Sequence, residues 1–453
     1  MRKIITLFLL VLSGTLSYGQ DGCWAKIAAG GNRVIAIAQD GTLWSWGAGG
    51  GGNLGLGDQT LRLVPTQIGT DNDWQTVSLG AAIKTDGTLW VWGSNDDGQL
   101  GLGDRDNRLV PTQLGTDTNW QSIEIGHASH SLAVKTDGTL WAWGYGASGQ
   151  LGNGITLRTT PTQVGNETNW KSISTGSNHS FAIKTDGTLW VWGRNANGEL
   201  GIYTSGDYQY SPAQKASTWL YAAAGGDHYG LAVRFDGTLW AWGKNGLGQL
   251  GIGSNNAVYQ PTQVGTDTNW KKIAPGLYQT IGLKTDGTLW AWGYNNYGQL
   301  GLGSINGNYF SPTQIGTDND WTDVETGPYF GAALKATGEI YTWGRNDYGQ
   351  LGTGNTTNRS TPILVNCPAA LNNENFNLLS ATIYPNPVKD ILTISSNTEI
   401  TRISIYNVLG QEVISEKLNA KEGVINTSGL QSGAYVVKVE SDSKVKSLKV
   451  IKQ

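Results

Sequence analysis

Few residues of this 453-residue chain have the types and spacing that catalysis or metal binding requires. Two of its four histidines, His130 and His179, each lie seven residues before an Asp-Gly pair. Other copies of this segment carry arginine, tyrosine, glutamine or phenylalanine there, which a metal site would not tolerate. The acidic segment 104–107 lacks the spacing of a calcium loop. Because the sequence also contains no zinc-protease helix motif, nucleophile elbow or phosphate loop, we expect no catalytic residue, metal or cofactor.

Aromatic side chains offer a different chemistry, the burial of a large surface against a partner at small cost in side-chain entropy. Tyr and Phe residues are concentrated in the loops of the second half of the repeats. We interpret them as a candidate binding face, with ordinary loop packing as the alternative. These residues are Tyr203, Tyr208, Tyr210, Tyr229, Tyr259, Tyr278, Tyr309, Phe310, Tyr329 and Phe330.

A repeated Trp-x-Trp-Gly pattern must position these side chains. Its second tryptophan recurs every 46 to 51 residues, and a fixed period of this size is typical of a repeat architecture. Each repeat is too small to bury its own apolar face, so neighbouring repeats must build the core together. The seven second tryptophans are Trp46, Trp92, Trp143, Trp192, Trp242, Trp292 and Trp343.

One repeat, residues 170–219, shows the elements of every copy. Strand-like runs occur at 170–174, 180–184, 188–192 and near 211–214. Asp186-Gly187 separates the second run from the third, and Asp-Gly between two such runs indicates a hairpin because the turn needs positive φ. Four strands in each of seven repeats predict an all-β fold, a closed seven-bladed β-propeller of four-stranded blades.

The tryptophans themselves are assigned to the core of this propeller. Seven of the 20 open the repeats and the other 13 occupy the Trp-x-Trp doublets, where Tyr341 fills the remaining place. Two residues apart on a strand, the members of a doublet share one face and can pack against the next blade. This complete assignment argues against a tryptophan array that binds carbohydrate.

The strand order divides the loops between two faces. Loops after the first and third strands open on one face, which we call the variable-loop face because the repeats differ there in length and residue type. The Asp-Gly turns and the connections between blades open on the other, which we call the Asp-Gly face. The second repeat is four residues shorter in its first loop, around Gly80, which predicts a notch in the variable-loop face.

The repeat resembles the regulator of chromosome condensation family over about residues 24–366. The resemblance rests on the Gly-x-x-His-Ser-x-Ala, Asp-Gly-x-x-Trp-x-Trp-Gly and Gly-Gln-Leu-Gly pieces of the repeat. It implies a seven-bladed β-propeller, but the family's functions range from nucleotide exchange to enzyme inhibition, so it does not imply one function. The sequence has neither the basic tail nor the protruding insertion of the nuclear exchange factors, and its net charge of −4 gives no footprint for nucleic acid.

Both ends of the repeat array carry a cysteine. Cys23 precedes the first repeat, and Cys367 follows the last. Because a closed propeller brings its first and last strands together, these cysteines should be neighbours and could form a disulfide that fastens the ring in an oxidising compartment. The alternative is two free buried cysteines.

The N-terminus is typical of an export signal. Arg2 and Lys3 precede the apolar run 4–12, and small residues then precede a cleavage site that we place between Gly19 and Gln20. The apolar run is too short to span a membrane, and no later segment replaces it. We therefore expect an exported protein without an integral membrane segment.

The composition changes near Cys367, which gives four predicted regions: a signal peptide at 1–19, the propeller at 20–368, a linker at 369–380 and a β-sandwich at 381–453. Segments 383–388, 407–413 and 433–439 of the last region resemble the type A C-terminal sorting domain of the type IX secretion system. The resemblance implies a Gram-negative Bacteroidetes-type cell, outer-membrane secretion machinery as a partner, and release or surface attachment after export.

Together these features predict an exported or cell-surface propeller, not an enzyme, that binds an extracellular protein through the variable-loop face. A glycan-binding accessory protein is the second hypothesis, and a hydrolase with an unrecognised site is the third. Tyrosine-rich loops without a free tryptophan favour a protein partner over a sugar.

Overall fold

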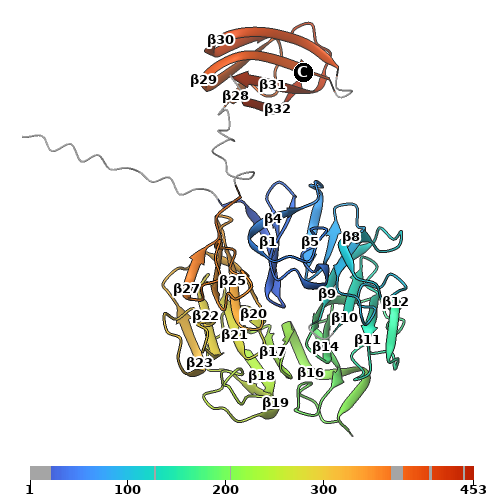
Figure 1. Ribbon diagram of the computed structural model, residues 1–453. Coiled ribbons are helices and arrows are strands. Elements are labelled where there is room, and N and C mark those ends of the chain that lie inside the picture. The colour runs from blue at the N-terminus through green and yellow to red at the C-terminus, as the bar shows by residue number, and fades with distance from the viewer. Residues whose placement is uncertain (1–21, 127–128, 205, 369–380, 408–410, 442–443) are drawn as a thin grey trace, which may run out of the picture. The chain divides into compact units, whose positions relative to one another are not determined.

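The computed structural model describes residues 22–126, 129–204, 206–368, 381–407, 411–441 and 444–453 (Figure 1). They form two compact units that meet in sequence between Cys367 and Pro368. The predicted signal peptide, its Gly19–Gln20 cleavage site and the linker at 369–380 lie outside the described residues. The all-β prediction is confirmed, since the elements formed by the described residues are strands except for one short 3-10 turn, η1 (Gly50–Gly52).

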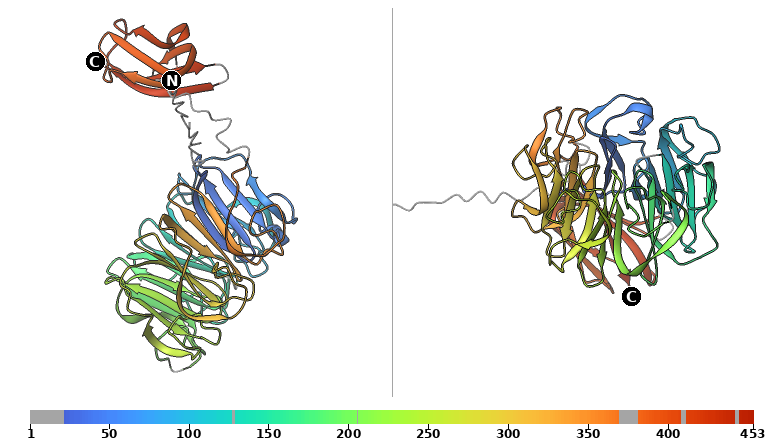
Figure 2. Two further views of the ribbon diagram at one scale, coloured as in Figure 1. Left: turned by 90° about the vertical axis from the view of Figure 1, so that its left-hand side faces the viewer. Right: turned by 90° about the horizontal axis from the view of Figure 1, so that it is seen from below.

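The first unit is the predicted ring of seven blades, which follow one another in chain order around a common axis (Figures 1 and 2). Each blade is an antiparallel meander of four strands. The first strand of each blade lines a central channel of about 390 Å³. These first strands are β1 (Trp24–Gly30), β5 (Trp74–Ser78), β9 (Trp120–Ile125), β13 (Trp170–Thr175), the last part of β16 (Tyr208–Ala224), β20 (Trp270–Pro275) and β24 (Trp321–Thr326).

The remaining strands follow outward in each blade. The second strands are β2 (Arg33–Ala38), β6 (Ala81–Lys84), β10 (His130–Lys135), β14 (His179–Lys184), β17 (Tyr229–Arg234), β21 (Gln279–Lys284) and β25 (Phe330–Lys335). The third are β3 (Leu43–Gly47), β7 (Leu89–Gly93), β11 (Leu140–Tyr145), β15 (Thr188–Arg194), β18 (Leu239–Gly243), β22 (Leu289–Tyr294) and β26 (Ile340–Gly344). The fourth are β4 (Arg62–Ile68), β8 (Arg108–Gln113), β12 (Leu157–Gln163), the first part of β16, β19 (Val258–Gln263), β23 (Asn308–Ile315) and β27 (Arg359–Leu364).

One strand is shared by two blades. β16 pairs with β15 at its start and with β17 at its end, so blades four and five form a single seven-stranded sheet. The glycine-containing connection found between most other blades is replaced here by residues 215–218, and Ser217 turns the chain with φ of 78°. The strand therefore continues where the other blades break it.

The second tryptophan of each doublet joins neighbouring blades. Trp292 is fully buried, and its indole Nε1 donates to the carbonyl oxygen of Gln249 in the preceding blade at 2.9 Å. A Cβ atom on Gly251 would lie 2.7 Å from that indole nitrogen, which explains the second glycine of Gly-Gln-Leu-Gly. Five further blades repeat this hydrogen bond, made by Trp46, Trp143, Trp192, Trp242 and Trp343.

The Asp-Gly face carries a second repeated device. In blade six, Asp286 accepts hydrogen bonds from the backbone and side chain of Thr288, whose hydroxyl in turn accepts from the indole of Trp290. Lys284 lies over the rings of Trp270 and Trp290 at 4.8 and 3.7 Å and pairs with an aspartate of the inter-blade connection. The Asp-Thr-Trp chain occurs in the first six blades, so this face is occupied by contacts that hold the ring together.

The ring closes at its two ends as predicted. The predicted disulfide between Cys23 and Cys367 is present, with Cα atoms 6.0 Å apart. Beside it, the backbone N–H of Trp24 donates to the carbonyl oxygen of Gly338 at 2.9 Å. The first blade is thereby fixed to the seventh by covalent and hydrogen bonds.

The second unit is a five-stranded antiparallel sheet that nearly closes on itself. It contains β28 (Ala381–Tyr384), β29 (Ile391–Tyr406), β30 (Glu412–Asn426), β31 (Gly433–Ser441) and β32 (Lys444–Lys452), and β29 pairs with β28, β30 and β31. β29 is continuous over 16 residues. The core of this unit is formed by aliphatic side chains of these strands, including Ile394, Ile403 and Val437.

Candidate binding face

Four tyrosines of blades six and seven meet on the variable-loop face, and we call them the tyrosine cluster: Tyr278, Tyr294, Tyr297 and Tyr329. Tyr278 and Tyr329 come from the loops after the first strands of their blades, while Tyr294 ends β22 and Tyr297 follows it. Neighbouring ring centroids lie 5.2 to 6.3 Å apart, and all four rings are half-buried.

A guanidinium group borders the tyrosine cluster. Arg345 follows β26, and its Cζ lies 5.2 Å from the ring centre of Tyr297 and 5.6 Å from that of Tyr329. Asp347 holds the same side chain through a hydrogen bond of 2.6 Å to Nε. A positive charge over aromatic faces is favourable, and the aspartate fixes the direction in which the arginine points. The arrangement is therefore an ordered aromatic and cationic surface.

The phenol of Tyr329 stays protonated in this surface. Partial burial raises its pKa, and the neighbouring tyrosines of the cluster raise it further. A protonated phenol can donate and accept a hydrogen bond, whereas a phenolate can only accept. At neutral pH the cluster thus offers apolar ring area together with hydroxyl groups.

Five of the predicted binding residues lie on the outermost strands or next to them. Tyr208 and Tyr210 are on β16, Tyr259 on β19, and Tyr309 and Phe310 on β23. Tyr210, Tyr259 and Phe310 occupy one equivalent position, at which each side chain contacts a glycine of the preceding blade. Tyr203, in a loop of blade four, is 88% exposed. These residues are distributed along the rim of three blades instead of forming one patch.

Two of the predicted residues are wrong as surface residues. Tyr229 and Phe330 are both 0% exposed. Each begins the second strand of its blade, and the hydroxyl of Tyr229 donates to the carbonyl oxygens of Gly276 and Gln279 in the next blade. His130 and His179 occupy the same position and also bond to the next blade, to Ser180 and to the carbonyl of Tyr229.

The structure thus brings together Tyr278 and Tyr329 of the predicted set and adds Tyr294, Tyr297 and Arg345, which the sequence analysis missed. A signal for them was present, because Tyr294 directly follows the Trp-Gly of its doublet and Tyr297 directly precedes Gly-Gln-Leu-Gly. That segment projects from the variable-loop face in every blade.

The central channel contains a charged cluster. Lys272 of β20 makes two contacts of 2.6 Å, to Asp323 and Glu325 of β24. Across the channel, burial raises the pKa of Glu124 to about 7, although Thr175 donates two hydrogen bonds to it. Within the described residues, no group of three or more His, Cys, Asp and Glu side chains could hold a metal ion.

This geometry defines a repeat β-propeller with an attached β-domain. Models of the Regulator of chromosome condensation (RCC1) repeat match residues 40–83, 86–134, 137–183, 236–283, 286–334 and 337–375, and a Secretion system C-terminal sorting domain matches 382–453. The chain therefore belongs to the regulator of chromosome condensation repeat family and ends in a secretion sorting domain. A second repeat model matches residues 120–150, 170–199, 270–299 and 321–350.

The matches to curated relatives are short. The chain is 52% identical over 42 residues to the ultraviolet-B receptor UVR8 of Arabidopsis thaliana, which covers 9% of this chain and 10% of the receptor. It is 45% identical over 42 residues to the E3 ubiquitin-protein ligase HERC2 of Homo sapiens, covering 9% of this chain and 1% of the ligase. The chain thus matches a tenth or less of these relatives' own length.

Solved structures agree in fold over most of the chain. Human WBSCR16 superposes with a TM-score of 0.64 at 22% identity, covering 72% of this chain and 95% of that one. Prp20p of Saccharomyces cerevisiae gives 0.62 at 19% identity, with coverages of 74% and 88%. At such identities the likeness concerns the fold alone. None of the described residues forms a helix with the length and hydropathy of a membrane span.

Proposed function

We propose that this chain is an exported, non-enzymatic binding protein that captures another protein through the tyrosine cluster and Arg345. The observation that carries the proposal is the convergence of four half-buried tyrosines and one guanidinium on the variable-loop face. Tyrosine and arginine are the residues that dominate the binding energy of protein interfaces, because they combine large contact area with few rotatable bonds or with directed hydrogen bonds.

The ring geometry favours a protein partner over a glycan. Sugars stack on flat aromatic platforms, but neighbouring rings of the cluster are inclined to one another by 43° to 75°. Such inclined rings present faces and edges in several directions, which suits the varied side chains of a protein surface better than a flat sugar ring. Among the predicted aromatic residues outside the cluster, Tyr208 and Tyr210 form one further pair, with ring centroids 6.0 Å apart and ring planes inclined by 38°.

The proposal is tested by capture from the surroundings of the cell. The purified chain carries an affinity tag and is incubated with culture medium and envelope extract, and the retained proteins are identified by mass spectrometry. We expect one retained species whose amount falls at least tenfold in the double variant Tyr297→Ala/Arg345→Ala. The wild-type chain on a glycan array is measured in parallel.

A matched control is available in blade three. Tyr145 directly follows Trp-Gly, as Tyr294 does, and is exposed, but it makes none of the ring contacts of the cluster. Tyr145→Ala should retain the partner within twofold of wild type. Equal retention by the cluster variant and the wild type would contradict the proposal, and so would saturable glycan binding that the cluster variant abolishes.

We further propose that the sorting domain delivers the propeller through a type IX secretion route to the cell surface or medium of a Bacteroidetes-type cell. Support comes from the matched sorting domain and from the disulfide, which requires an oxidising compartment. Deletion of residues 381–453 should leave the folded propeller in the periplasm, detected by fractionation. Undiminished secretion of the truncated chain would contradict this route.

A further inference from the structure

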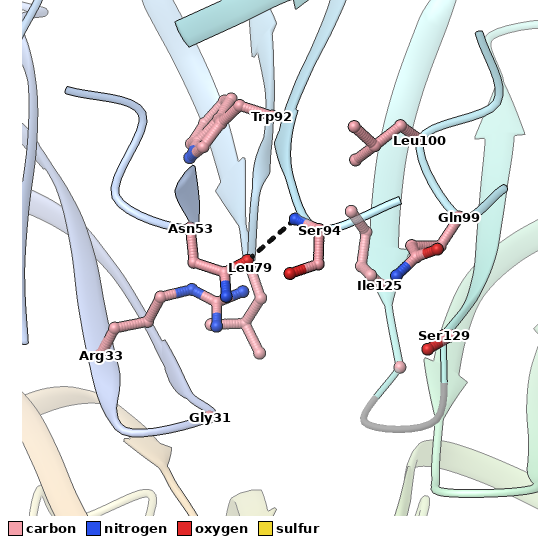
Figure 3. A pocket seen from close by; sticks show the side chains of 11 residues that line it. Gly31, Arg33, Asn53, Leu79, Trp92, Ser94, Gln99, Leu100, Ile125 and Ser129 are labelled. Carbon is pink, nitrogen blue, oxygen red and sulfur yellow. Dashed lines mark hydrogen bonds between the residues drawn. The ribbon is translucent and has the colours of Figure 1, made fainter. Parts of the chain in front are cut away.

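A pocket of about 180 Å³ opens on the variable-loop face where the short first loop of blade two predicts a notch (Figure 3). We call it the notch pocket. It lies between blades one, two and three, away from the tyrosine cluster of blades six and seven. Polar side chains line one part of it and apolar side chains the other: Arg33, Asn53, Ser94, Gln99 and Ser129 against Leu79, Trp92, Leu100 and Ile125.

The first repeated contact between blades is missing here. The residue seven positions before the hairpin Asp-Gly reaches the next blade in most repeats, as His179 reaches the carbonyl of Tyr229 and Gln279 that of Gly327. In blade one this residue is Arg33. The shortened loop of blade two leaves it without such an acceptor, and Nε of Arg33 is buried with no hydrogen-bond partner.

The second repeated contact is missing at the same place. Six doublet tryptophans donate Nε1–H to a carbonyl of the preceding blade, but Nε1 of Trp92 has no partner although the side chain is 1% exposed. Blade one carries Gly-Gly-Asn-Leu-Gly where the other blades carry Gly-Gln-Leu-Gly or Gly-Glu-Leu-Gly, and Asn53 stands at the glutamine position. Arg33 and Trp92 both line the notch pocket, although Nε of Arg33 and Nε1 of Trp92 are themselves closed off from water.

The side-chain amides of Asn53 and Gln99 also have N–H groups that make no hydrogen bond with any residue that the structure describes. The amide oxygen of Asn53 accepts a hydrogen bond from the backbone N–H of Ser94 at 3.2 Å, and that of Gln99 accepts one from the backbone N–H of Asp97 at 3.0 Å. The NH2 groups of both side chains are therefore available to donate to a ligand. Among the described residues, no carboxylate pairs with Arg33 within 4 Å. Burial lowers the pKa of Arg33 to about 10, so its guanidinium is charged at neutral pH. The pocket therefore presents donors and one positive charge.

We propose that the notch pocket binds a carboxylate, with the guanidinium of Arg33 as the charged partner and the amides of Asn53 and Gln99 as further donors beside the ring of Trp92. One planar guanidinium matches a planar, singly charged carboxylate in a two-bond fork, whereas a phosphate dianion would leave charge uncompensated. Leu79, Leu100 and Ile125 cover the hydrocarbon part of the acid. The volume corresponds to about six water molecules, enough for a small organic acid or an acidic side chain.

The test observes the indole N–H signal of Trp92 directly. The chain with its C-terminal domain is labelled with 15N in its tryptophan indoles, and the signal is assigned by Trp92→Phe. Sodium propionate, as a free acid, and a blocked glycine peptide with one glutamate, as an acidic side chain, are titrated at constant ionic strength. We expect a saturable shift of the Trp92 signal with propionate, and the same shift with the peptide if a side chain also enters.

Variants separate this site from general anion attraction. Arg33→Gln should weaken propionate binding at least tenfold, and Arg33→Lys, which keeps the charge without the fork, should weaken it about threefold to tenfold. Arg105→Gln removes an equal charge from an exposed loop of blade two and should change affinity by less than twofold. The absence of a saturable Trp92 shift in the wild type, equal losses in Arg33→Gln and Arg105→Gln, or tighter binding of sulfate than of propionate would each overturn the proposal.

Discussion

The two faces of the propeller are built from the same repeats but differ in how their side chains are used. On the Asp-Gly face, six blades carry the same Asp-Thr-Trp chain of hydrogen bonds, and lysines cover the tryptophan rings. On the variable-loop face, aromatic rings of blades six and seven form the tyrosine cluster, while blades one to three leave the notch pocket.

This difference separates residues that hold the ring together from residues available for a partner. A side chain that recurs in every blade satisfies a contact that every blade needs. A side chain that occurs in one or two blades and stays at the surface is available for a partner, whereas Tyr229 and Phe330, which also occur once each, are buried. The same distinction gives the following predictions, in which changes of the repeated contacts should act on stability and changes of the variable face on binding.

Loss of a repeated tryptophan should have the largest effect. Trp292→Ala removes a fully buried ring between two blades and should lower the free energy of unfolding by about 5 kcal/mol, whereas Tyr297→Ala on the variable-loop face should lower it by less than about 1 kcal/mol. Denaturant unfolding followed by tryptophan fluorescence measures both, since all 20 tryptophans lie in the propeller. Similar losses in the two variants would break the distinction between the faces.

Removal of the disulfide that closes the ring should have the second-largest effect on stability. The disulfide joins residues 344 positions apart, and Cys23→Ser/Cys367→Ser should lower the free energy of unfolding by about 4 kcal/mol. The reason is that a cross-link that closes a long loop removes much conformational entropy from the unfolded chain. The reduced wild type should behave like the double variant in the same unfolding experiment. An unchanged midpoint in both would show that hydrogen bonds at the closure suffice.

The sequence predicted the ring itself far better than its surface. Seven copies of one pattern determine the number of blades, the hairpin turns and the closure, because each copy needs its neighbours to bury its tryptophans. The aromatic side chains that meet on the surface come from separate blades, and their contacts depend on how these blades are inclined to one another. The spacing of residues along the chain gives no information about this inclination. Tyr229 and Phe330 show the limit, since their position equals that of His130 and His179, and comparison of the copies would have placed them between blades.

The shared strand β16 provides an exception inside the scaffold. Lys215 occupies a core position that Val164 and Val264 fill in neighbouring blades, and burial lowers its pKa to about 7. Between pH 7 and 10.5 the unfolded chain holds this proton and the folded chain does not, so the free energy of unfolding should rise with pH. Lys215→Val should remove this rise and stabilise the propeller by about 3 kcal/mol at pH 7.

Unfolding curves at pH 7, 8 and 9 measure the Lys215 effect. Leu189, which pairs with Lys215 across the blade, remains unchanged and keeps the local packing comparable. A wild type and a Lys215→Val variant with the same pH slope would show that the amine is not held neutral in the folded state.

A smaller effect is expected from the buried histidine that joins blades four and five. His179 is fully buried, and burial followed by the nearby His228 lowers its pKa to about 3. Below pH 6.5 this imidazole is protonated in the unfolded chain but stays neutral in the folded chain, so the free energy of unfolding falls as the pH falls. His179→Gln, the residue of blade six, should recover about 2 kcal/mol at pH 5 and nothing at pH 8.

Acid unfolding of the wild type and the His179→Gln variant checks this prediction. If the variant and the wild type differ in free energy of unfolding by the same amount at pH 5 and pH 8, the substitution changes packing but not proton uptake. His179 would then make no contribution to acid unfolding.

The most direct test of the contrast between the faces compares two aromatic surfaces in one capture experiment. Phe235 is 60% exposed beside the Asp-Gly turn of blade five, and Phe235→Ala is matched with Tyr297→Ala/Arg345→Ala on the variable-loop face. Retention of the captured protein should fall at least tenfold in the double variant and remain within twofold of wild type in Phe235→Ala. Loss of retention in Phe235→Ala with full retention in the double variant would contradict the assignment of binding to the variable-loop face.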